Sequence, residues 1–258
     1  MTAVEPLAQD DFDAFHAVYE AAFARDHDTP WLAVEKRVNL RSDAYRDTVA
    51  LVARAGGDVV GGATAILPLQ DNRGFAFVEV FVRPGDQRAG HGTALLEALL
   101  DEVRAAGRTI AFSQPSWGVD EDTSPAREFA RAHGFSLDML DALRELRLPA
   151  TLPPAVVAEG YTLQTWRGPC PDDLLDEYAE LRRMLVAEAP NGEAGIEPEH
   201  WDAARVRQDE ADLAEVGRIM QVMVARAPDG RLAGHTQLAF PACAEVYQWD
   251  TLLRPAHR

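Results

Sequence analysis

A chain of 258 residues is long enough for two ordinary domains, and 47% hydrophobic with 26% charged residues is the composition of a globular protein. The formal net charge of −17 argues against nucleic acid as a partner, because phosphates require a basic surface. The same charge would attract a cationic partner such as an amine, although an acidic surface also serves simply to keep a protein soluble.

Targeting and metal-binding signals are missing from the sequence. The first residues, MTAVEPLAQDD, contain neither a basic stretch nor an apolar run, so we expect no signal peptide, and no segment reaches the ~18 apolar residues of a membrane span. Cys170 and Cys243 are too few for a disulfide framework, and neither they nor the isolated His16 and His235 stand in a metal-ligand spacing. We therefore expect a cytoplasmic protein without a metal and without a membrane partner.

Hydrophobic spacing predicts alternating strands and helices in the first half of the chain. We expect strands at 4–7, 48–55, 59–67, 75–82 and 109–113, helices at 12–27, 31–41, 93–106 and 125–133, and one or two final strands within 135–148. The following PATLPP, residues 149–154, is the linker expected between two domains.

After this linker the same landmarks return in the same order. The paired landmarks are Asp10-Asp11 with Asp172-Asp173, the turns at 56–58 and 228–230, and the strand ends at 79–84 and 250–255. This domain-sized repeat predicts a tandem duplication, with a complete domain at 1–150 and a partial one at 155–258. The second copy stops where its own loop after the strand should begin. We therefore expect either a fragment of a protein of ~330 residues, or a second copy that the first domain or a partner chain covers, as in a homodimer.

The segment Gln87-Arg88-Ala89-Gly90-His91-Gly92 lies between the most apolar strand and a clear amphipathic helix. The amides of such a loop and the N-terminus of the helix converge on one point and favour an anion. Gly90 and Gly92 allow close approach of the backbone, and Gln87, Arg88 and His91 can add donors. The loop does not have the spacing of a nucleotide P-loop or of a dinucleotide-binding site.

The segment EVFVRPGDQRAGHGTALLEAL resembles the acetyl-CoA signature of the GCN5-related N-acetyltransferase (GNAT) superfamily. The central pattern of that signature, (Q/R)-x-x-G-x-(G/A), corresponds here to Gln87, Gly90 and Gly92. The segment AREFARAHGF resembles the family's next helix, which ends in a Gly-Phe pair, here Gly134-Phe135. The tandem arrangement is similar to actinobacterial two-domain acetyltransferases, including the mycothiol synthase type.

The resemblance implies an α/β fold with a mixed, splayed sheet flanked by helices, followed by the front half of a second similar domain. It also implies acetyl-CoA, or another acyl-CoA, as co-substrate. Its pantetheine would pair with the backbone of Val80 and Val82, and an amide near Phe81 or Val82 would polarise the acyl carbonyl. The pyrophosphate would be held by the segment that ends at Thr93, namely Gln87, Arg88, Ala89, Gly90, His91, Gly92 and Thr93.

Glu79 is the candidate general base, because it shares the parity of Phe77 and Phe81 on an apolar strand. A carboxylate is costly to bury there unless it is used or paired, so a structural ion pair or a solvated edge position is the alternative. Asp250 occupies the matching place in the second copy. The family's tyrosine acid would fall at Ala130, so no thiolate donor is visible, and His133 is better explained as a helix-end residue.

Two functions remain open from the sequence. The first is an N-acetyltransferase that moves an acetyl group from acetyl-CoA to the amine of a small molecule. The second is a non-catalytic acetyl-CoA-binding or structural domain of a tandem enzyme whose activity lies in the second domain. By the resemblance, acceptor specificity would reside at about residues 25–47, which carry no diagnostic motif.

Overall fold

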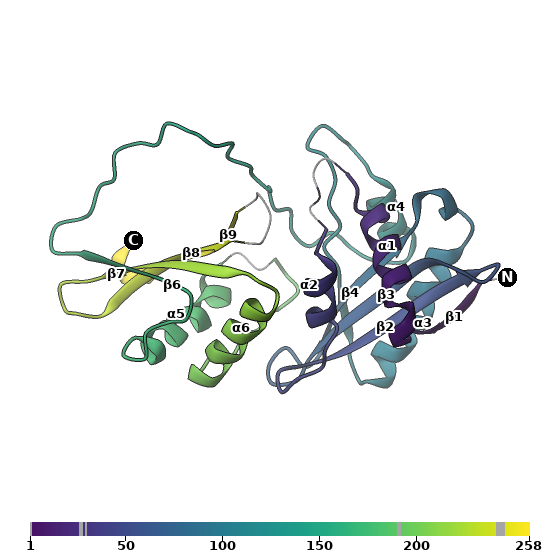
Figure 1. Cartoon of the computed structure of the whole chain (residues 1–258), viewed down its shortest axis with the longest axis horizontal. Coiled ribbons are helices and arrows are strands. Elements are labelled where there is room, and N and C mark those ends of the chain that lie inside the picture. Colours follow the sequence, from purple (N-terminus) through teal and green to yellow (C-terminus); the bar gives the residue numbers. More distant parts are fainter. Residues whose placement is uncertain (1, 26–27, 29, 190–191, 241–245) are drawn as a thin grey trace. The chain divides into compact units, whose positions relative to one another are not determined.

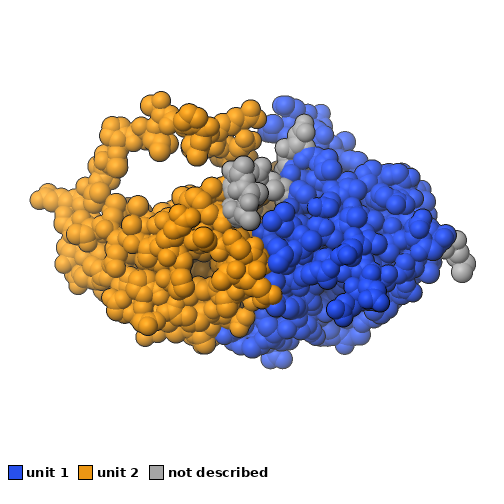
Figure 2. All heavy atoms as spheres, viewed as in Figure 1, with its two compact units in different colours: residues 1–136 blue, residues 137–258 orange. Residues whose placement is uncertain are grey.

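The chain forms two compact units (Figure 2). The computed structural model describes residues 2–25, 28, 30–189, 192–240 and 246–258. Unit 1 comprises residues 1–136 and unit 2 comprises residues 137–258. Each unit has its own sheet and is described by itself.

Unit 1 is a five-stranded mixed sheet with helices on both faces (Figure 1), which confirms the predicted fold class. The strands lie in the order β1-β2-β3-β4-β5, and all neighbours are antiparallel except β4 and β5. The strands are β1 (Ala3–Pro6), β2 (Arg46–Ala55), β3 (Asp58–Pro68), β4 (Phe75–Val82) and β5 (Ile110–Phe112). The helices are α1 (Phe12–Ala22), α2 (Ala33–Asn39), α3 (His91–Ala105) and α4 (Pro125–Ala132), with 3-10 turns η1 (Gln9–Asp11) and η2 (Pro84–Asp86).

Side chains that alternate along the strands form a separate core on each face of this sheet. Leu95 and Leu99 of α3 pack on one face, and Phe15 of α1 packs on the other. Gly62 makes room for the second core, since a Cβ at this position would lie 2.5 Å from the rings of both Phe15 and Phe81. The two rings instead meet edge-on, with centroids 5.0 Å apart.

The sheet of unit 1 parts between β4 and β5. The two strands pair only at Phe75, Ala76 and Phe77, whereas β4 remains paired with β3 as far as Val82. From Val78 to Val82, no strand in the described part of the chain covers the second edge of β4. The backbone groups along this edge are therefore open to an extended ligand.

Unit 2 repeats the front part of unit 1. Its sheet has the order β6-β7-β8-β9, with all neighbours antiparallel. The strands are β6 (Thr162–Arg167), β7 (Ile219–Arg226), β8 (Leu232–Phe240) and β9 (Tyr247–Leu253), and the other elements are α5 (Leu175–Glu188), α6 (Ala203–Glu215) and the 3-10 turn η3 (Pro255–His257). The chain order of strand, two helices and three strands is thus the order from β1 to β4.

Details of backbone geometry also recur, which confirms the predicted repeat. An irregularity interrupts the β2–β3 register at Ala53/Arg54, and the β7–β8 register is interrupted at Ala225/Arg226. The Arg83 amide donates to the Val60 carbonyl at 2.9 Å, and the Arg254 amide donates to the Ala233 carbonyl at 2.8 Å. These features lie at corresponding places of the two copies, so the repeat extends to hydrogen-bond register.

Three predicted helices differ from the structure by two or more residues at one end or at both. The helix expected at 93–106 begins at His91, because Gly90 adopts a φ of 87° and acts as its N-cap. The helix expected at 31–41 is confined to Ala33–Asn39. The helix expected at 12–27 ends at Ala22, and its last predicted residues, 26 and 27, lie outside the described residues.

The prediction of final strands within 135–148 is wrong, since this segment contains no strand. Its alternating apolar side chains lie largely in solvent, with Leu143 86% and Leu148 75% exposed. A segment in which apolar residues alternate forms a strand only where another strand of the sheet has a free edge to pair with it. Within the described ranges, none of the helices is both long and apolar enough to span a membrane.

Gly62→Ala should destabilise unit 1 by about 1–3 kcal/mol, because the added methyl group must displace the packed rings of Phe15 and Phe81. Gly74→Ala is the matched control, since a Cβ there would meet only Thr109 Oγ1, at an ordinary 3.5 Å. Urea unfolding followed by circular dichroism measures both variants. Equal midpoints for the two variants would contradict the proposed close packing.

Candidate functional site

The backbone conformation of the loop after β4 orients successive amides toward a common point. Arg88 has a φ of 65° and Gly90 a φ of 87°, so left-handed residues alternate with ordinary ones along the loop. Such alternation turns successive N–H groups toward a common centre. The first amides of α3, at His91, Gly92 and Thr93, add to this set because a helix offers them no acceptor of its own.

The side chains of the loop have different surroundings. Arg88 is exposed, and Gln87 Nε2 donates to the Val82 carbonyl at 3.2 Å, which ties the loop to the end of β4. The His91 imidazole is buried and its Nδ1 lies 2.8 Å from Thr2 Oγ1. His91 therefore presents its amide to the loop, whereas its side chain belongs to the protein interior.

Helix α4 supports the start of α3. Gly92 allows this contact, because a Cβ there would lie 3.3 Å from the Phe129 ring. His133 Nδ1 donates to the Phe129 carbonyl at 2.8 Å, and in the neutral ring Nε2 then accepts from the Thr93 hydroxyl at 3.1 Å. His133 thus closes the end of α4 and holds Thr93, in agreement with its interpretation as a helix-end residue.

Successive residues of β4 direct their backbone N–H and C=O groups toward opposite edges of the strand. Because the Arg83 amide faces β3, alternation directs the backbone groups of Phe81 and Glu79 toward β3 and those of Val82 and Val80 toward the open edge. The bond from Gln87 to the Val82 carbonyl agrees with this assignment. Val80 and Val82 therefore lie where the sequence analysis expects ligand-binding backbone, whereas the Phe81 amide faces β3.

Glu79 lies on the face of the sheet that α1 and α2 cover. Its carboxylate forms an ion pair with Lys36 of α2, whose side chain is only 7% exposed, against 32% for Glu79. The Lys36 ammonium also lies over the Tyr19 ring, 4.2 Å from its centroid. Burial, assisted by the charge of Glu79, raises the pKa of Tyr19 above its usual value, so the phenol stays protonated.

Lys36 and Tyr19 are the residues of this cluster that the sequence analysis missed. Tyr19 looks like one more apolar position of an amphipathic helix. One signal was present for Lys36: it is the only lysine in the chain, where all other basic side chains apart from histidine are arginine.

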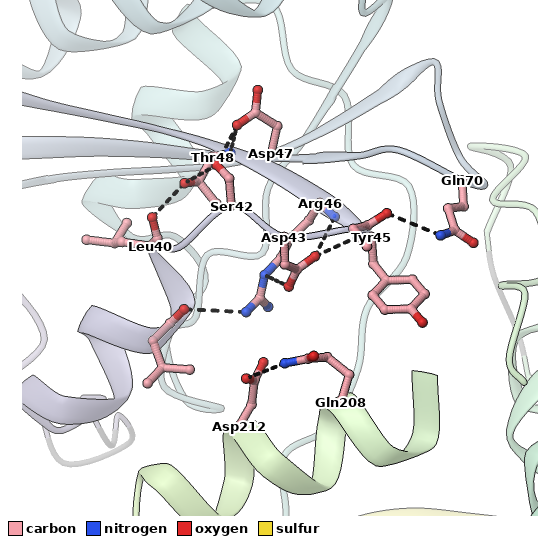
Figure 3. A network of polar contacts seen from close by, with 12 residues as sticks. Leu40, Ser42, Asp43, Tyr45, Arg46, Asp47, Thr48, Gln70, Gln208 and Asp212 are labelled. Carbon is pink, nitrogen blue, oxygen red and sulfur yellow. Dashed lines mark hydrogen bonds and ion pairs between the residues drawn. The ribbon is translucent and has the colours of Figure 1, made fainter. Parts of the chain in front are cut away.

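A polar network fixes the connection from α2 to β2 (Figure 3). The Asp43 carboxylate accepts from the amides of Tyr45 and Arg46 at 2.7 and 2.9 Å. The Thr48 hydroxyl donates to the Leu40 carbonyl at 2.6 Å, just after the end of α2. This network lies largely within residues 25–47 and holds the helix that carries Lys36.

Unit 2 has an acid at the place of Glu79, but its surroundings differ. Asp250 Oδ2 lies 3.5 Å from Nε of the buried Arg182, which also bonds Asp209 at 3.2 Å. Burial raises the pKa of Asp250, and Arg182 opposes this rise. The arrangement of a strand acid against a helix cation thus occurs in both units.

Two buried polar side chains of β8 lie on the same face of this sheet. His235 is 4% exposed and packs edge-on against Tyr178, and neither of its ring nitrogens has a hydrogen-bond partner among the residues that the structure describes. Gln237 is 1% exposed, and among the same residues its carboxamide has no partner either. Burial, with a further effect from Arg182, lowers the pKa of His235 from 6.5 to about 4. The ring is therefore neutral at pH 7.

In the ranges that the structure describes, no group of three or more histidine, cysteine, aspartate or glutamate side chains could hold a metal ion. Cys170 is a buried free thiol, and Cys243 lies outside the described residues.

Comparison with known proteins gives consistent matches. Residues 9–135 match the family model described as the acetyltransferase (GNAT) family. Two curated relatives are mycothiol acetyltransferases. The protein of Thermomonospora curvata is 31% identical, and the match covers 90% of this chain and 70% of the relative. The protein of Sanguibacter keddieii is 30% identical, and the match covers 92% of this chain and 70% of the relative.

A solved structure extends these matches to the whole chain. It is a tandem GNAT protein from the clavulanic acid biosynthesis pathway, 28% identical, with a TM-score of 0.73 over 100% of this chain and 81% of its own. That protein is described as a tandem GNAT protein, in agreement with the internal repeat found here.

Acid should destabilise unit 2 through His235. The folded chain binds the imidazole proton less tightly than the unfolded chain, so stability present above pH 6.5 is lost as the pH falls toward 4, by roughly 3 kcal/mol at most. The raised pKa of Asp250 acts in the opposite direction, so the comparison must be made between variants. Urea midpoints between pH 7.5 and pH 4.5 measure the effect.

His235→Leu should remove most of this loss. It should also stabilise the unit at pH 7, because it removes two buried nitrogens that have no hydrogen-bond partner in the described part of the chain. The same replacement at His200, whose side chain is 58% exposed, controls for the loss of a histidine and should retain the acid sensitivity. An unchanged pH profile in His235→Leu would refute the assignment.

Proposed function

The chain belongs to the GNAT family of acetyltransferases, and on that premise we propose that it transfers an acetyl group from acetyl-CoA to the amine of a small molecule. The family uses acetyl-CoA as its co-substrate. We assign residues 1–150 as the complete acyl-CoA-binding domain and residues 155–258 as the front part of a second domain of the same kind. The names of the curated relatives support a small-molecule acceptor, and the net charge of −17 would favour a cationic amine.

The parting of β4 from β5, directly before the amide-rich loop, is the observation that carries this proposal. The amides from Arg88 to Thr93 would bind the pyrophosphate, with the exposed Arg88 as an additional donor. Val80 and Val82 would bind the pantetheine amides along the open edge, as a strand binds its neighbour.

Backbone direction also narrows the choice of the group that polarises the acyl carbonyl. The Phe81 amide is directed at β3, whereas the Val82 amide is directed at the open edge. We therefore assign the Val82 amide to this role and the Phe81 ring to the core beneath the site.

Glu79 remains the candidate base, since it is the acidic residue of the stretch of β4, Val78–Val82, that has parted from β5. Ala130 supplies no acid for the leaving thiolate. Tyr19, in the same cluster, stays protonated, and the raised pKa of its phenol makes it a weak proton donor for the thiolate.

The second candidate function is a non-catalytic acetyl-CoA-binding unit beside a catalytic second domain. The ion pair between Glu79 and Lys36, together with Ala130, favours it, because the base has a resident partner. Both candidates require unit 1 to bind acetyl-CoA, and turnover separates them.

Gly90→Ala should weaken acetyl-CoA binding about tenfold or more, because an L-residue disfavours the left-handed conformation that turns the loop amides inward. Gly107→Ala is the matched control: it has a φ of 74°, likewise has open space around its Cβ position, and lies at the other end of α3. Each variant should lose about 1–2 kcal/mol of stability. Isothermal calorimetry with acetyl-CoA measures the binding.

Equal affinities in the two glycine variants would show that the loop does not hold the ligand. A full-length chain that gives no binding heat with acetyl-CoA or other acyl-CoAs would overturn both candidate functions.

Glu79→Gln should lower the turnover number by roughly 100-fold to 10,000-fold, because it removes proton acceptance from the attacking amine while keeping the side-chain shape. The measurement is thiol release from acetyl-CoA with a panel of small amines. Glu97→Gln, at an exposed position of α3, is the control for the loss of a carboxylate. Full activity in Glu79→Gln would remove Glu79 as the base, and binding without turnover by the unaltered chain would favour the second candidate.

A further inference from the structure

Lys36 is exceptional in this protein. It is the only lysine in a chain with 25 lysine and arginine residues, so every other strongly basic side chain is an arginine. This single lysine is not on the surface, where a solubilising cation belongs, but is 7% exposed against the candidate base. The use of lysine at this buried position therefore needs an explanation that would not apply equally to arginine.

A structural cation alone does not explain the choice. Arginine forms ion pairs with carboxylates and stacks on aromatic rings at least as well as lysine does. Unit 2 shows this, since Arg182 faces Asp250 and lies 3.9 Å over the Trp201 ring. What lysine adds is a nitrogen that can give up a proton and then act as a nucleophile, whereas a guanidinium remains protonated.

The surroundings of Lys36 Nζ suit this chemistry. A carboxylate that can receive its proton is in direct contact, and the Tyr19 ring supports it from the other side at 4.2 Å. Glu79 belongs to the stretch of β4, Val78–Val82, whose second edge is open. The amine therefore lies beside the same stretch of strand that the proposed function assigns to the thioester end of acetyl-CoA.

We propose that Lys36 is itself an acetyl acceptor, so that unit 1 acetylates its own chain at this residue; the inference rests on the proposed binding of acetyl-CoA to unit 1. Glu79 takes a proton from the Lys36 ammonium, and the freed Nζ attacks the thioester carbonyl carbon. The new C–N bond forms as the C–S bond breaks, and the second proton that the nitrogen loses passes to the leaving thiolate of coenzyme A. The proton held by Glu79 is released to solvent. The products are N-acetyl-lysine and free coenzyme A.

Acetylation would change the site as well as mark it. The amide nitrogen of acetyl-lysine carries no charge, so the ion pair with Glu79 is lost and the carboxylate becomes available to another amine. Unit 2 has no equivalent event, because the partner of Asp250 is an arginine.

The experiment incubates the full chain with acetyl-CoA and follows the intact mass, then locates the modification by peptide mapping. We expect one acetyl group at Lys36, formed at least tenfold faster in the folded chain than in the same chain unfolded in urea. Lys36→Arg should abolish it, and Glu79→Gln should slow it at least tenfold. The N-terminal amine is the only other primary amine that the chain carries, and its peptide reports the background reaction.

Calorimetry with acetyl-CoA on the same sample separates the possible failures. If acetyl-CoA binds and Lys36 is not acetylated, or is acetylated no faster than in the unfolded chain, the inference is wrong and the proposed function stands. If acetyl-CoA does not bind, the proposed function fails and the inference fails with it. Because the decisive comparison uses the unaltered chain, a variant that does not fold leaves the result intact.

Discussion

The site depends on one constraint: β4 must leave β5 after three paired residues and still continue as a strand. Its other edge is paired with β3 as far as Val82, so the backbone stays extended, while one row of amides and carbonyls has no strand partner among the described residues. Unpaired backbone groups of this kind are unfavourable in a closed interior and useful beside a ligand with amides of its own. Because the loop with Arg88 and Gly90 follows within a few residues, one short segment can bind both the amide-bearing and the anionic part of a carrier.

The two units show how one framework supports different chemistry. Both place an acid of the last long strand against a buried cation from a covering helix, with Glu79 facing Lys36 and Asp250 facing Arg182. In unit 1 the cation is an amine above a phenol ring. In unit 2 it is a guanidinium next to a neutral imidazole, His235, at the position where unit 1 has Gly62. The strand register is the same at these places of the two units, while the side chains at the matching positions differ.

Local patterns in the sequence predicted much of this structure. The order of elements, β4, the loop and the repeat follow from periodicity, glycine placement and internal similarity, all of which are local properties. The pair of Glu79 with Lys36 could not be predicted in this way, since it joins residues on different elements. The prediction of strands at 135–148 was wrong for a related reason. Alternating apolar residues favour a strand, but the strand that it pairs with must come from another part of the chain.

Because Lys36 is the single lysine of the chain, it offers a way to measure the opening of α2. A protease that cuts only after lysine has a single target bond in this protein, in α2, whose middle residues are largely buried. Such a bond is cleaved only when the helix opens, so the cleavage rate reports the opening of α2, either locally or together with more of the unit. Digestion with such a protease therefore measures how often α2, the helix that carries Lys36, opens.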